Sequence, residues 1–493
     1  MINIKIKNTE RISVSRIIKL ILWIILFFGA LVHIVLSLNE GYGALNKSYE
    51  TSKPESFVLH GVRNVGTGAP LYPEFGQGQY WIHAYNPLTY LPAGLITRLF
   101  KLSVQQSLIA GRIISYVSMI CLALMLFCWF WINMPSKYSA IFILMCILYY
   151  HSIVSHDFFR LRPESPGLLF TYAGIITFLS KRRWRIYVSA VLFVIAYLFK
   201  QPFIAAPVAI FVFLFISKKY SEMFIFALTY WVCVLTFLLL MFALTGKGFF
   251  QHTIISMAVN EVDSGLYCSR YLIYLKMSFL GPLLTLPLAF IGIRNNKNTL
   301  FLFIYFLVCL AWTYYSSAKI GASVNYFGEI AVLILIIIAF SISLMEYNKN
   351  IQLPVTIIFF FSFIFILHYY GIIGFPTTST IHNGDISGYL KKYHTVKGKK
   401  LIMHDSIAAR FGGDDILFDW LLMDILYTEG LIDFTGFAKK ISSGEYGLIV
   451  IDSNRAYNKL EDLIIETINK GPYQLIYADE FIKEYKKDIH NGF

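Results

Sequence analysis

The chain carries little charge, and it lacks the motifs of several enzyme classes. Only 14% of its 493 residues are charged and 57% are hydrophobic, whereas about 25% of the residues in a soluble protein are charged. This composition excludes an ordinary soluble protein and indicates an integral membrane protein. The sequence has no HExxH motif, no nucleophile elbow and no phosphate-binding glycine loop. These absences argue against a zinc protease, a serine hydrolase and an ATP-driven machine.

The sequence also lacks paired cysteines. Five of its six cysteines lie inside apolar segments, and no CxxC pair or metal-ligand spacing occurs, so we expect them to pack between helices. The formal net charge of +13 would suggest a nucleic-acid partner for a soluble protein. Lysine and arginine collect in the cytoplasmic loops of membrane proteins, and no basic-aromatic binding module accompanies the charge here. We therefore expect no nucleic-acid partner.

Apolar segments suited to crossing a bilayer follow one another along the chain. A basic N-terminal stretch precedes the first, and no cleavage site follows it, so we interpret it as an uncleaved helix with a cytoplasmic N-terminus. The predicted spans are 17–38, 105–132, 138–153, 165–180, 184–199, 203–217, 222–245, 270–293, 298–315, 326–345 and 353–373. The sequence thus predicts a polytopic α-helical membrane protein with about 11 transmembrane helices.

Segment 86–100 is short and contains two prolines. If it crossed the membrane, the basic run 181–185 would face outward, against the positive-inside rule. We therefore expect this segment to lie at the membrane surface, inside a first outer loop at 38–104. The resulting topology places the polar segments 154–164 and 316–325 on the same outer face. The chain shows no internal repeat of the kind that transporters often have, and polar features on one face suggest chemistry at a membrane surface.

The long apolar segments end at about residue 375. We therefore divide the chain into a transmembrane domain, 1–375, and an extracytoplasmic domain, 376–493. Short apolar runs at Lys400–Met403, Gly447–Ile451 and Tyr473–Tyr477 are typical of strands, and a helical pattern separates the last two. Strands that alternate with helices predict a small parallel α/β layer. Since it has no GxGxxG motif and no P-loop, we assign it no nucleotide.

Glu55 is the first candidate for a catalytic residue. It follows Pro54 and begins an amphipathic run, so it lies near a helix N-terminus, where a carboxylate is favoured. A general base must be a carboxylate or an imidazole that can reach the acceptor hydroxyl. Glu40 is the closest rival, and Glu74 is a weaker one. The alternative is that Glu55 is only a solvated or helix-capping acid in a loop.

Two basic segments are candidates for binding a phosphate group. The stretch 156–164 holds two acids, Asp157 and Glu164, and two arginines, Arg160 and Arg162. Charges between apolar spans are costly unless they are paired or functional, and the planar fork of arginine suits phosphate oxygens. Lys200 and Gln201 interrupt a second apolar run; the alternative is that these side chains only reach the lipid interface.

The remaining candidates combine an acid with aromatic residues. Glu329 begins an apolar helix and follows Asn325 and Tyr326, so it needs either a cationic partner or the helix dipole. Tyr85 and Tyr90 belong to an aromatic and proline-rich stretch that suits a sugar or prenyl group. Interfacial anchoring explains most such aromatic residues.

Taken in order, these motifs resemble those of the polytopic glycosyltransferases of the C-type fold that use polyprenyl-phosphate sugars. The branch that they resemble is the bacterial family-39-like proteins, related to protein O-mannosyltransferases and lipid A aminoarabinose transferases. The matching motifs are Glu55 with Gly68–Tyr72, Tyr85–Tyr90, Arg162–Glu164, Lys200–Gln201 and Asn325–Glu329. The acidic pair of that branch is reduced here to Pro54–Glu55, so the assignment of the catalytic base depends on one carboxylate. Glu40 and Asp157 are the alternative bases.

The resemblance implies an inverting transfer on the outer face of the bacterial inner membrane. The donor would be a sugar on a polyprenyl phosphate, and the acceptor a hydroxyl of a glycan, lipid or protein. Glu55 would be the base, and Arg160, Arg162 and Lys200 would bind the donor phosphate. The residues expected to position the substrates are Asp157, Glu164, Gln201, Asn325, Tyr326, Glu329, Tyr85 and Tyr90. We expect no cofactor, and neither a divalent cation nor a protein-bound metal is indicated.

Two interpretations from other classes stay open beside the transferase. A lipid-linked glycan transporter or flippase would use the same basic cavity without cleaving the donor. A non-catalytic membrane scaffold would only display the domain 376–493.

Overall fold

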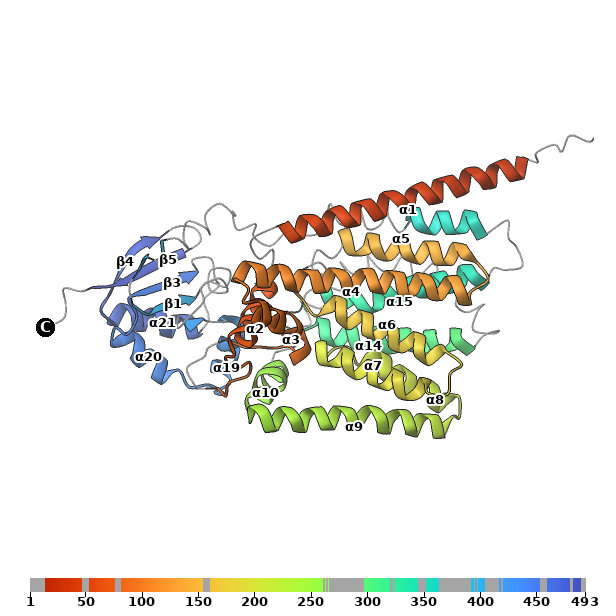
Figure 1. The fold of residues 1–493 in the computed structure, drawn as a ribbon. Helices are drawn as coiled ribbons and strands as arrows, with labels where there is room; N and C mark the ends of the chain where they lie inside the picture. The colour runs from red at the N-terminus through yellow and green to blue at the C-terminus, as the bar shows by residue number, and fades with distance from the viewer. Residues whose placement is uncertain are drawn as a thin grey trace, which may run out of the picture.

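The structure is a computed structural model of the whole chain, and it describes most but not all of its residues. The described residues are 14–46, 53–75, 81–153, 160–259, 262, 265, 297–319, 322, 324–344, 352–362, 392–393, 395–396, 398–403, 416–417, 420–452, 459–478 and 482–488. The predicted span 270–293 and the predicted domain boundary near residue 375 lie outside these residues. Figure 1 shows a bundle of long helices with an α/β domain beyond one end.

Long apolar helices form the bundle. Its helices are α1 (Val14–Asn46), α4 (Val104–Asn133), α5 (Lys137–Ile153), α6 (Glu164–Leu179), α7 (Arg185–Phe199), α8 (Ala205–Ile216), α9 (Tyr220–Thr245), α14 (Lys297–Ser317), α15 (Gly328–Leu344) and the helix Gln352–Ser362. The helix α15 is buried along nearly its whole length and is hydrophobic on all sides, as expected of a helix enclosed by other helices. The bundle core therefore surrounds α15.

Five helices within the described residues are long and apolar enough to cross a membrane. They are Arg16–Leu36, Val104–Asn133, Tyr220–Thr245, Asn298–Ser317 and Asn325–Leu344. The predicted spans at 165–180, 184–199 and 203–217 form helices of 16, 15 and 12 residues, and a full crossing needs about 20 residues unless the ends are tucked in. The polytopic helical architecture is thus present, and the number 11 stays a prediction.

The predicted first outer loop folds into α2 (Lys53–Thr67), η1 (Pro87–Thr89) and α3 (Leu91–Phe100). From later in the chain, α10 (Gly248–Phe250) and the π-helical turn η3 (Gln251–Ile255) pack against it. The ten residues of α3 rise only about 15 Å, which is half of the hydrocarbon thickness. Helix α3 packs on α2 and α4. Gly61 permits this packing, because a Cβ there would lie 2.3 Å from the ring of Tyr90.

The end of α3 and the start of α4 follow from local sequence. Lys101 terminates α3 in the left-handed conformation, with φ of 51°. Ser103 then caps α4: its hydroxyl accepts the N–H of Gln106, whose side chain accepts the N–H of Ser103. This reciprocal capping box satisfies two N–H groups at the helix end. It fixes the start of the helix that carries Arg112.

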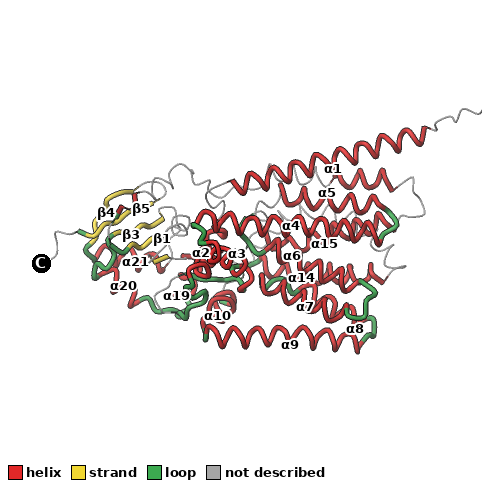
Figure 2. The backbone as a smooth tube through the Cα atoms, viewed as in Figure 1, coloured by secondary structure: helices red, strands yellow, loops and turns green. Residues whose placement is uncertain are grey.

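The C-terminal domain has a five-stranded sheet in the order β2-β1-β3-β5-β4. Its strands are β1 (Lys400–Met403), β2 (Ile416–Leu417), β3 (Leu448–Asp452), β4 (Tyr473–Ala478) and β5 (Ile482–Lys487), and its helices are α19 (Trp420–Thr428), α20 (Thr435–Ser442) and α21 (Lys459–Lys470). Figure 2 shows that the strands are confined to this end of the molecule. Strand β1 has the bounds expected from the sequence.

The sequence predicts a parallel layer, but the sheet is mixed, because it contains a further strand, β5, that the apolar pattern does not reveal. Strands β1, β2 and β3 are parallel, but β5 pairs antiparallel with both β3 and β4. Only three residues separate β4 from β5, and a parallel connection needs a crossover of about a dozen or more residues. The charged sequence IKEYKK concealed β5. Its buried acid, Glu484, accepts hydrogen bonds from Lys392 at 2.5 Å and from the Tyr393 hydroxyl at 2.8 Å.

The first outer loop also packs against the C-terminal domain. Trp81 is fully buried in one hydrophobic cluster with Ile402 and Val450 of the sheet. The next residue, Ile82, joins the cluster that covers the other face of the sheet. The loop is therefore held between the helix bundle and the domain, in the position that Figure 1 shows for α2 and α3.

Candidate active site

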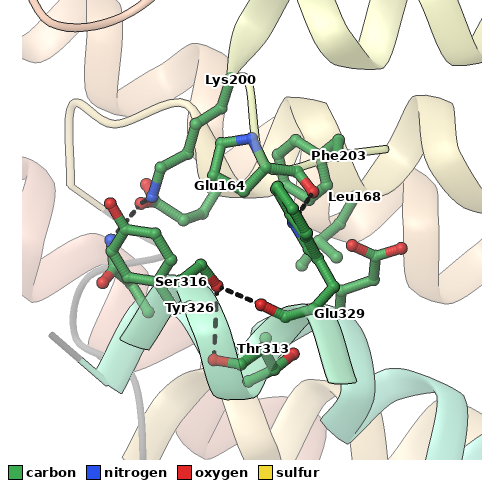
Figure 3. A pocket seen from close by; sticks show the side chains of 12 residues that line it. Glu164, Leu168, Lys200, Phe203, Thr313, Ser316, Tyr326 and Glu329 are labelled. Atoms are coloured by element: carbon green, nitrogen blue, oxygen red, sulfur yellow. Dashed lines mark hydrogen bonds and ion pairs between the residues drawn. The ribbon is translucent and has the colours of Figure 1, made fainter. Parts of the chain in front are cut away.

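A small cavity lies where α6, α7, α14 and α15 end or begin, on the side of the bundle that faces the C-terminal domain. It is narrow, with room for little more than a water molecule, and it is partly open to the outside. Glu164 comes from the start of α6, Lys200 from the end of α7, and Glu329 from the first turn of α15. Figure 3 shows Lys200 and Glu164 across the cavity from Thr313 of α14. Five of the predicted site residues line it: Glu164, Lys200, Asn325, Tyr326 and Glu329.

Lys200 and Glu164 form a buried ion pair at this cavity. The Lys200 Nζ lies 2.8 Å from Glu164 Oε1, and the two residues are 3% and 1% exposed. The amide Nδ2 of Asn325, in the turn η4 (Val324–Phe327), donates to the same oxygen at 2.5 Å. Glu164 Oε2 and Asn325 Oδ1 are buried and have no hydrogen-bond partner among the described residues. Leaving such an atom unsatisfied costs about 1–3 kcal/mol, so this pair is suited to receive a polar ligand.

Two aromatic rings enclose the Lys200 ammonium group. Its Nζ lies 4.2 Å from the ring centroid of Tyr326 and 5.5 Å from that of Tyr85. A cation over an aromatic face is stabilised by the ring quadrupole. Burial raises the pKa of the Tyr85 phenol to about 12, and the neighbouring Lys200 opposes that rise. Tyr85 is therefore a neutral hydroxyl donor beside a charged lysine.

Glu329 is anchored from two neighbouring helices. The Tyr305 hydroxyl of α14 donates to Glu329 Oε1 at 2.6 Å, and the Tyr172 hydroxyl of α6 donates to the Glu329 carbonyl at 2.6 Å. Of these two bonds, only the Tyr305 bond reaches the carboxylate, and no cation among the described residues pairs with it. Glu329 fixes the wall of the cavity opposite Lys200.

Tyr90 and Gln201 hold the segment that carries Tyr85. The Tyr90 hydroxyl accepts the backbone N–H of Tyr85 at 3.2 Å, and Tyr72 donates its hydroxyl to the Tyr85 carbonyl at 2.7 Å. Gln201 donates to the Ala84 carbonyl at 2.8 Å. Tyr90 is itself 1% exposed. The two predicted positioning residues therefore act on Tyr85 and not on the cavity directly.

Three histidines stack where the loop meets the η3 turn; His83 and His252 are buried, and His60 is partly buried. The rings of His60 and His83 lie 5.1 Å apart, and those of His83 and His252 lie 5.9 Å apart. His252 Nδ1 accepts the His83 N–H, so its Nε2 carries the proton that it donates to the Pro73 carbonyl at 2.8 Å. Burial lowers the pKa of His60 to about 3 and that of His252 to about 4. The stack is therefore neutral and links α2 to the η3 turn.

The structure places Glu55 away from the cavity, in a closed ion pair. Glu55 and Arg112 of α4 are both fully buried. Glu55 Oε1 accepts Arg112 Nε at 2.8 Å and the Leu161 N–H at 2.9 Å, while Oε2 accepts Arg112 Nη2 at 2.7 Å. Both carboxylate oxygens thus serve a bidentate arginine, the geometry of a strong tether. In this arrangement Glu55 joins α2 to α4 and to the segment before α6.

The two arginines of the predicted phosphate site differ in position. Arg162 is 4% exposed and lines a neighbouring small cavity with Ser115, whose hydroxyl donates to the Arg162 carbonyl at 3.2 Å. Arg160 is partly buried. Asp157 lies outside the described residues. Glu40 belongs to α1, and Glu74 accepts the N–H of Lys247 at 3.1 Å, away from the cavity.

The structure adds residues that the sequence did not single out. Trp312, Thr313 and Ser316, in the last turns of α14, line the cavity. The Trp312 indole donates to the Pro202 carbonyl at 2.8 Å and thereby joins α14 to the Lys200 turn. The sequence offered one signal for them: the hydroxyl residues Thr313 and Ser316 lie at the end of the predicted span 298–315. The described residues contain no group of three or more His, Cys, Asp or Glu side chains suited to a metal ion.

The fold is similar to that of solved membrane proteins. ArnT from Cupriavidus metallidurans bound to undecaprenyl phosphate gives a TM-score of 0.66 at 10% identity, over 93% of this chain and 98% of ArnT. Apo ArnT gives 0.65 at 10% identity, over 92% and 97%. The archaeal oligosaccharyltransferase AglB from Archaeoglobus fulgidus, in complex with an inhibitory peptide and a dolichol-phosphate, gives 0.54 at 10% identity, over 96% and 75%. No protein-family model and no curated protein matches the sequence.

These likenesses, with the apolar helices, define the class of protein. The chain is a polytopic membrane protein with the fold of ArnT and AglB, the C-type glycosyltransferase fold. The fold expected from the sequence motifs is confirmed. At 10% identity, the likeness shows the fold, and the chemistry must be argued from this chain's own residues.

Proposed function

We propose that this chain is a membrane glycosyltransferase that moves a sugar from a polyprenyl-phosphate donor to a hydroxyl acceptor. The observation that carries the proposal is the Lys200–Glu164 pair, buried at a cavity with two unsatisfied oxygens. The same fold in ArnT holds undecaprenyl phosphate. A phosphodiester donor and a nucleophilic hydroxyl are the substrates that a buried cation beside a buried carboxylate would serve.

In this proposal Lys200 binds the donor phosphate. Its ammonium group is held in place by the rings of Tyr326 and Tyr85, and Arg162 acts electrostatically on both Glu164 and Tyr85. The phosphate charge increases as the sugar leaves, so fixed cations stabilise the transition state more than the bound donor. Gln201 positions the segment that carries Tyr85 through its hydrogen bond to the Ala84 carbonyl. Arg160 lies in the segment just before α6.

The geometry favours Glu164 over Glu55 as the general base. Glu164 Oε2 has no hydrogen-bond partner among the described residues and borders the cavity. Both oxygens of Glu55 are occupied by donors, and its side chain has no exposed surface. An acceptor hydroxyl can therefore reach Glu164 without breaking an arginine pair, whereas it would have to displace Arg112 from Glu55.

The reaction then runs in one displacement. The acceptor oxygen attacks the anomeric carbon, its proton passes to Glu164 Oε2, and the bond from the anomeric carbon to the phosphate oxygen breaks. Polyprenyl phosphate leaves with the electron pair, held by Lys200, and the anomeric configuration inverts. The transition state has oxocarbenium character. Neither a covalent enzyme intermediate nor a cofactor is needed for this sequence of bond changes.

The site's place in the molecule supports chemistry at the outer membrane face. The cavity and the first outer loop lie at the end of the bundle that carries the C-terminal domain, and the basic loops lie at the other end. Under the positive-inside rule the basic loops are cytoplasmic. The domain and the cavity are then extracytoplasmic, and the acceptor is a glycan, lipid or protein of the cell envelope.

The test uses purified full-length chain in vesicles with a labelled undecaprenyl-phosphate sugar. We expect sugar transfer with stoichiometric release of undecaprenyl phosphate, lost in Glu164→Gln and retained per folded molecule in Glu55→Gln. Transfer abolished by Glu55→Gln alone would return the base to Glu55. Donor that crosses the vesicle membrane without any release of undecaprenyl phosphate would identify a lipid-linked glycan transporter instead.

A further inference from the structure

The loops at the other end of the bundle form a second charged surface. One loop joins α6 to α7 and carries Lys181, Arg182 and Arg183; another joins α8 to α9 and carries Lys218 and Lys219. The α6 helix separates this surface from Glu164 by about 24 Å, from 16 residues at 1.5 Å each. The surface therefore lies outside the candidate active site.

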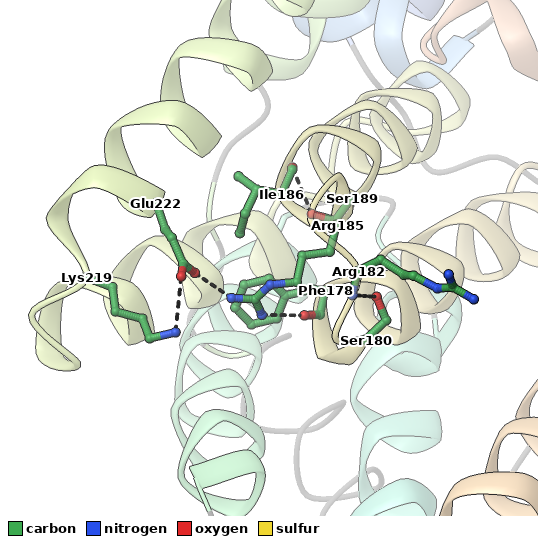
Figure 4. Close-up of polar contacts among 8 residues, drawn as sticks. All are labelled: Phe178, Ser180, Arg182, Arg185, Ile186, Ser189, Lys219 and Glu222. Atoms are coloured by element: carbon green, nitrogen blue, oxygen red, sulfur yellow. Dashed lines mark hydrogen bonds and ion pairs between the residues drawn. The ribbon is translucent and has the colours of Figure 1, made fainter.

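An ion pair fastens the two loops together. Arg185 at the start of α7 lies 2.5 Å from Glu222 in the first turn of α9. Its guanidinium group also donates to the Phe178 carbonyl at 2.9 Å and lies 5.3 Å from the Phe178 ring centroid. Lys219 lies 3.2 Å from the other oxygen of Glu222. Figure 4 shows this arrangement, with the side chain of Arg182 directed away from the pair.

The single acid of this surface is therefore fully used, and four cations remain. Lys181, Arg182, Arg183 and Lys218 are exposed and have no ionic partner among the described residues. Lys218 is held in the left-handed conformation, with φ of 56°, and its N–H donates to the Phe215 carbonyl at 3.0 Å. The positive-inside rule explains why cations occur in such loops. It does not explain why the Arg185–Glu222 ion pair holds the two loops together as one surface.

Aromatic side chains flank the cations. Trp184 and Tyr220 are 52% and 53% exposed, beside the first and second loop. Exposed tryptophan and tyrosine at helix ends are typical of the level of lipid head groups. A ligand of this surface must therefore be anionic and must lie at the bilayer interface. A phospholipid whose head group carries a phosphodiester meets both requirements, and each basic residue near an anionic leaflet contributes about 1 kcal/mol.

We infer that Lys181, Arg182, Arg183 and Lys218 form a binding site for the head group of an anionic phospholipid, clamped by the Arg185–Glu222 pair. The head-group phosphate lies between the two loops, and the acyl chains follow the exposed faces of α7 and α9. Charge complementarity selects an anionic over a zwitterionic lipid.

The test titrates phosphatidylglycerol into the lipid-stripped, full-length protein and follows the unfolding temperature. Phosphatidylcholine and inorganic phosphate are the comparison ligands. We expect stabilisation by phosphatidylglycerol, weakened by added salt, and little effect of the other two. Lys181→Gln, Arg182→Gln, Arg183→Gln and Lys218→Gln together should weaken the apparent affinity at least about tenfold. The charge-retaining variant Arg182→Lys with Arg183→Lys should stay within about threefold of the unmodified chain.

A matched control removes four exposed lysines of the C-terminal domain: Lys439, Lys459, Lys486 and Lys487. Affinity equally weakened in that control, or equal stabilisation by phosphatidylcholine, would overturn the site. Equal stabilisation by inorganic phosphate would overturn the lipid assignment in favour of a free anion. Should the fourfold variant not fold, Arg182→Gln with Arg183→Gln alone must still weaken phosphatidylglycerol binding, and unchanged binding there contradicts the inference.

Discussion

Two buried ion pairs lie in the same half of the helix bundle, and their surroundings differ. In the Arg112–Glu55 pair, three donors from the described residues occupy the carboxylate, and neither side chain is exposed. In the Lys200–Glu164 pair, two donors share one oxygen, and the other oxygen has no partner among the described residues. The first pair is closed by protein on all sides, whereas the second borders a cavity.

The unused hydrogen-bonding capacity of a buried charge distinguishes a functional ion pair from a structural one. Burying two charges is expensive, and the attraction between them repays that cost only with good geometry and further hydrogen bonds. The Arg112–Glu55 pair meets this condition and joins three segments of chain. The Lys200–Glu164 pair leaves hydrogen-bonding capacity unused, which is costly in the empty protein and useful when a polar substrate arrives.

The largest expected effect is on catalysis, in Glu164→Gln. We expect transfer per folded molecule to fall about 10²- to 10⁴-fold, since that is the usual contribution of a general base. The affinity for the donor should not weaken, because Lys200 keeps its charge and its aromatic neighbours. Kinetics in vesicles that separate kcat from the donor KM would check this. A raised KM at constant kcat would mean that Glu164 only positions the donor.

The next effect is on stability, in Glu55→Gln. Removing one partner of a buried pair costs about 3–5 kcal/mol, and Arg112 would stay buried without its counter-ion. Denaturant unfolding in detergent should show this loss, while transfer per folded molecule stays within about threefold of the unmodified chain if the pair is structural.

The double variant Glu55→Met with Arg112→Met is the control for that prediction. An apolar pair of similar volume is often neutral or stabilising, so it should regain most of the lost stability. If the double variant were as unstable as Glu55→Gln, the stability would depend on the charges themselves and not only on filling the space between α2 and α4.

A smaller effect is expected on donor binding in Lys200→Met. A hydrogen bond to a charged group contributes about 1.5–3 kcal/mol, which corresponds to donor affinity about 10- to 150-fold weaker. Binding of an undecaprenyl-phosphate sugar to the purified variant measures this change directly. Lys101→Met, at an exposed position after α3, is the matched control and should bind the donor normally. Unchanged binding in Lys200→Met would remove Lys200 from the phosphate site.

The smallest effect concerns pH and the histidine stack of the outer loop. The folded-state pKa values of His60 and His252, about 3 and 4, lie below the ordinary value of 6.5. The unfolded chain therefore binds protons first, and the stability contributed by the neutral rings is present above pH 6.5 and lost below it. Between about pH 7.5 and 5.5 the loss is about 1.4 kcal/mol per histidine.

Unfolding curves at the two pH values would measure that loss. His60→Leu should reduce the pH dependence by about 1.4 kcal/mol and leave the sign unchanged. A pH dependence as steep in His60→Leu as in the unmodified chain would show that other groups cause it.

Much of the fold and part of the site could be predicted from the sequence. The fold followed from the order of motifs, and the bounds of β1 from a short apolar run. Glu164, Lys200, Asn325, Tyr326 and Glu329 were expected together and do line one cavity. Each is a polar residue at the end of an apolar segment, where burial is costly unless the residue is paired or functional. Helix ends on one face of a bundle also lie close together in space.

The sequence could not show which carboxylate is open to a substrate. In the sequence Glu55 is a lone acid at the start of a helix, because its partner, Arg112, is 57 positions away. Arg112 was a signal, because a charged residue inside an apolar span needs a partner. Packing of α3 on α2 and α4 brings the two together, and only tertiary structure reveals that. Strand β5 was concealed for a similar reason, since its buried Glu484 depends on Lys392 and Tyr393.

The most direct test compares Glu164→Gln with Glu55→Gln in one assay: the undecaprenyl phosphate released from a labelled donor, per folded molecule, in a single turnover. We expect release about 10²- to 10⁴-fold slower in Glu164→Gln and close to normal in Glu55→Gln. Normal release in Glu164→Gln, with release abolished in Glu55→Gln, would contradict this expectation.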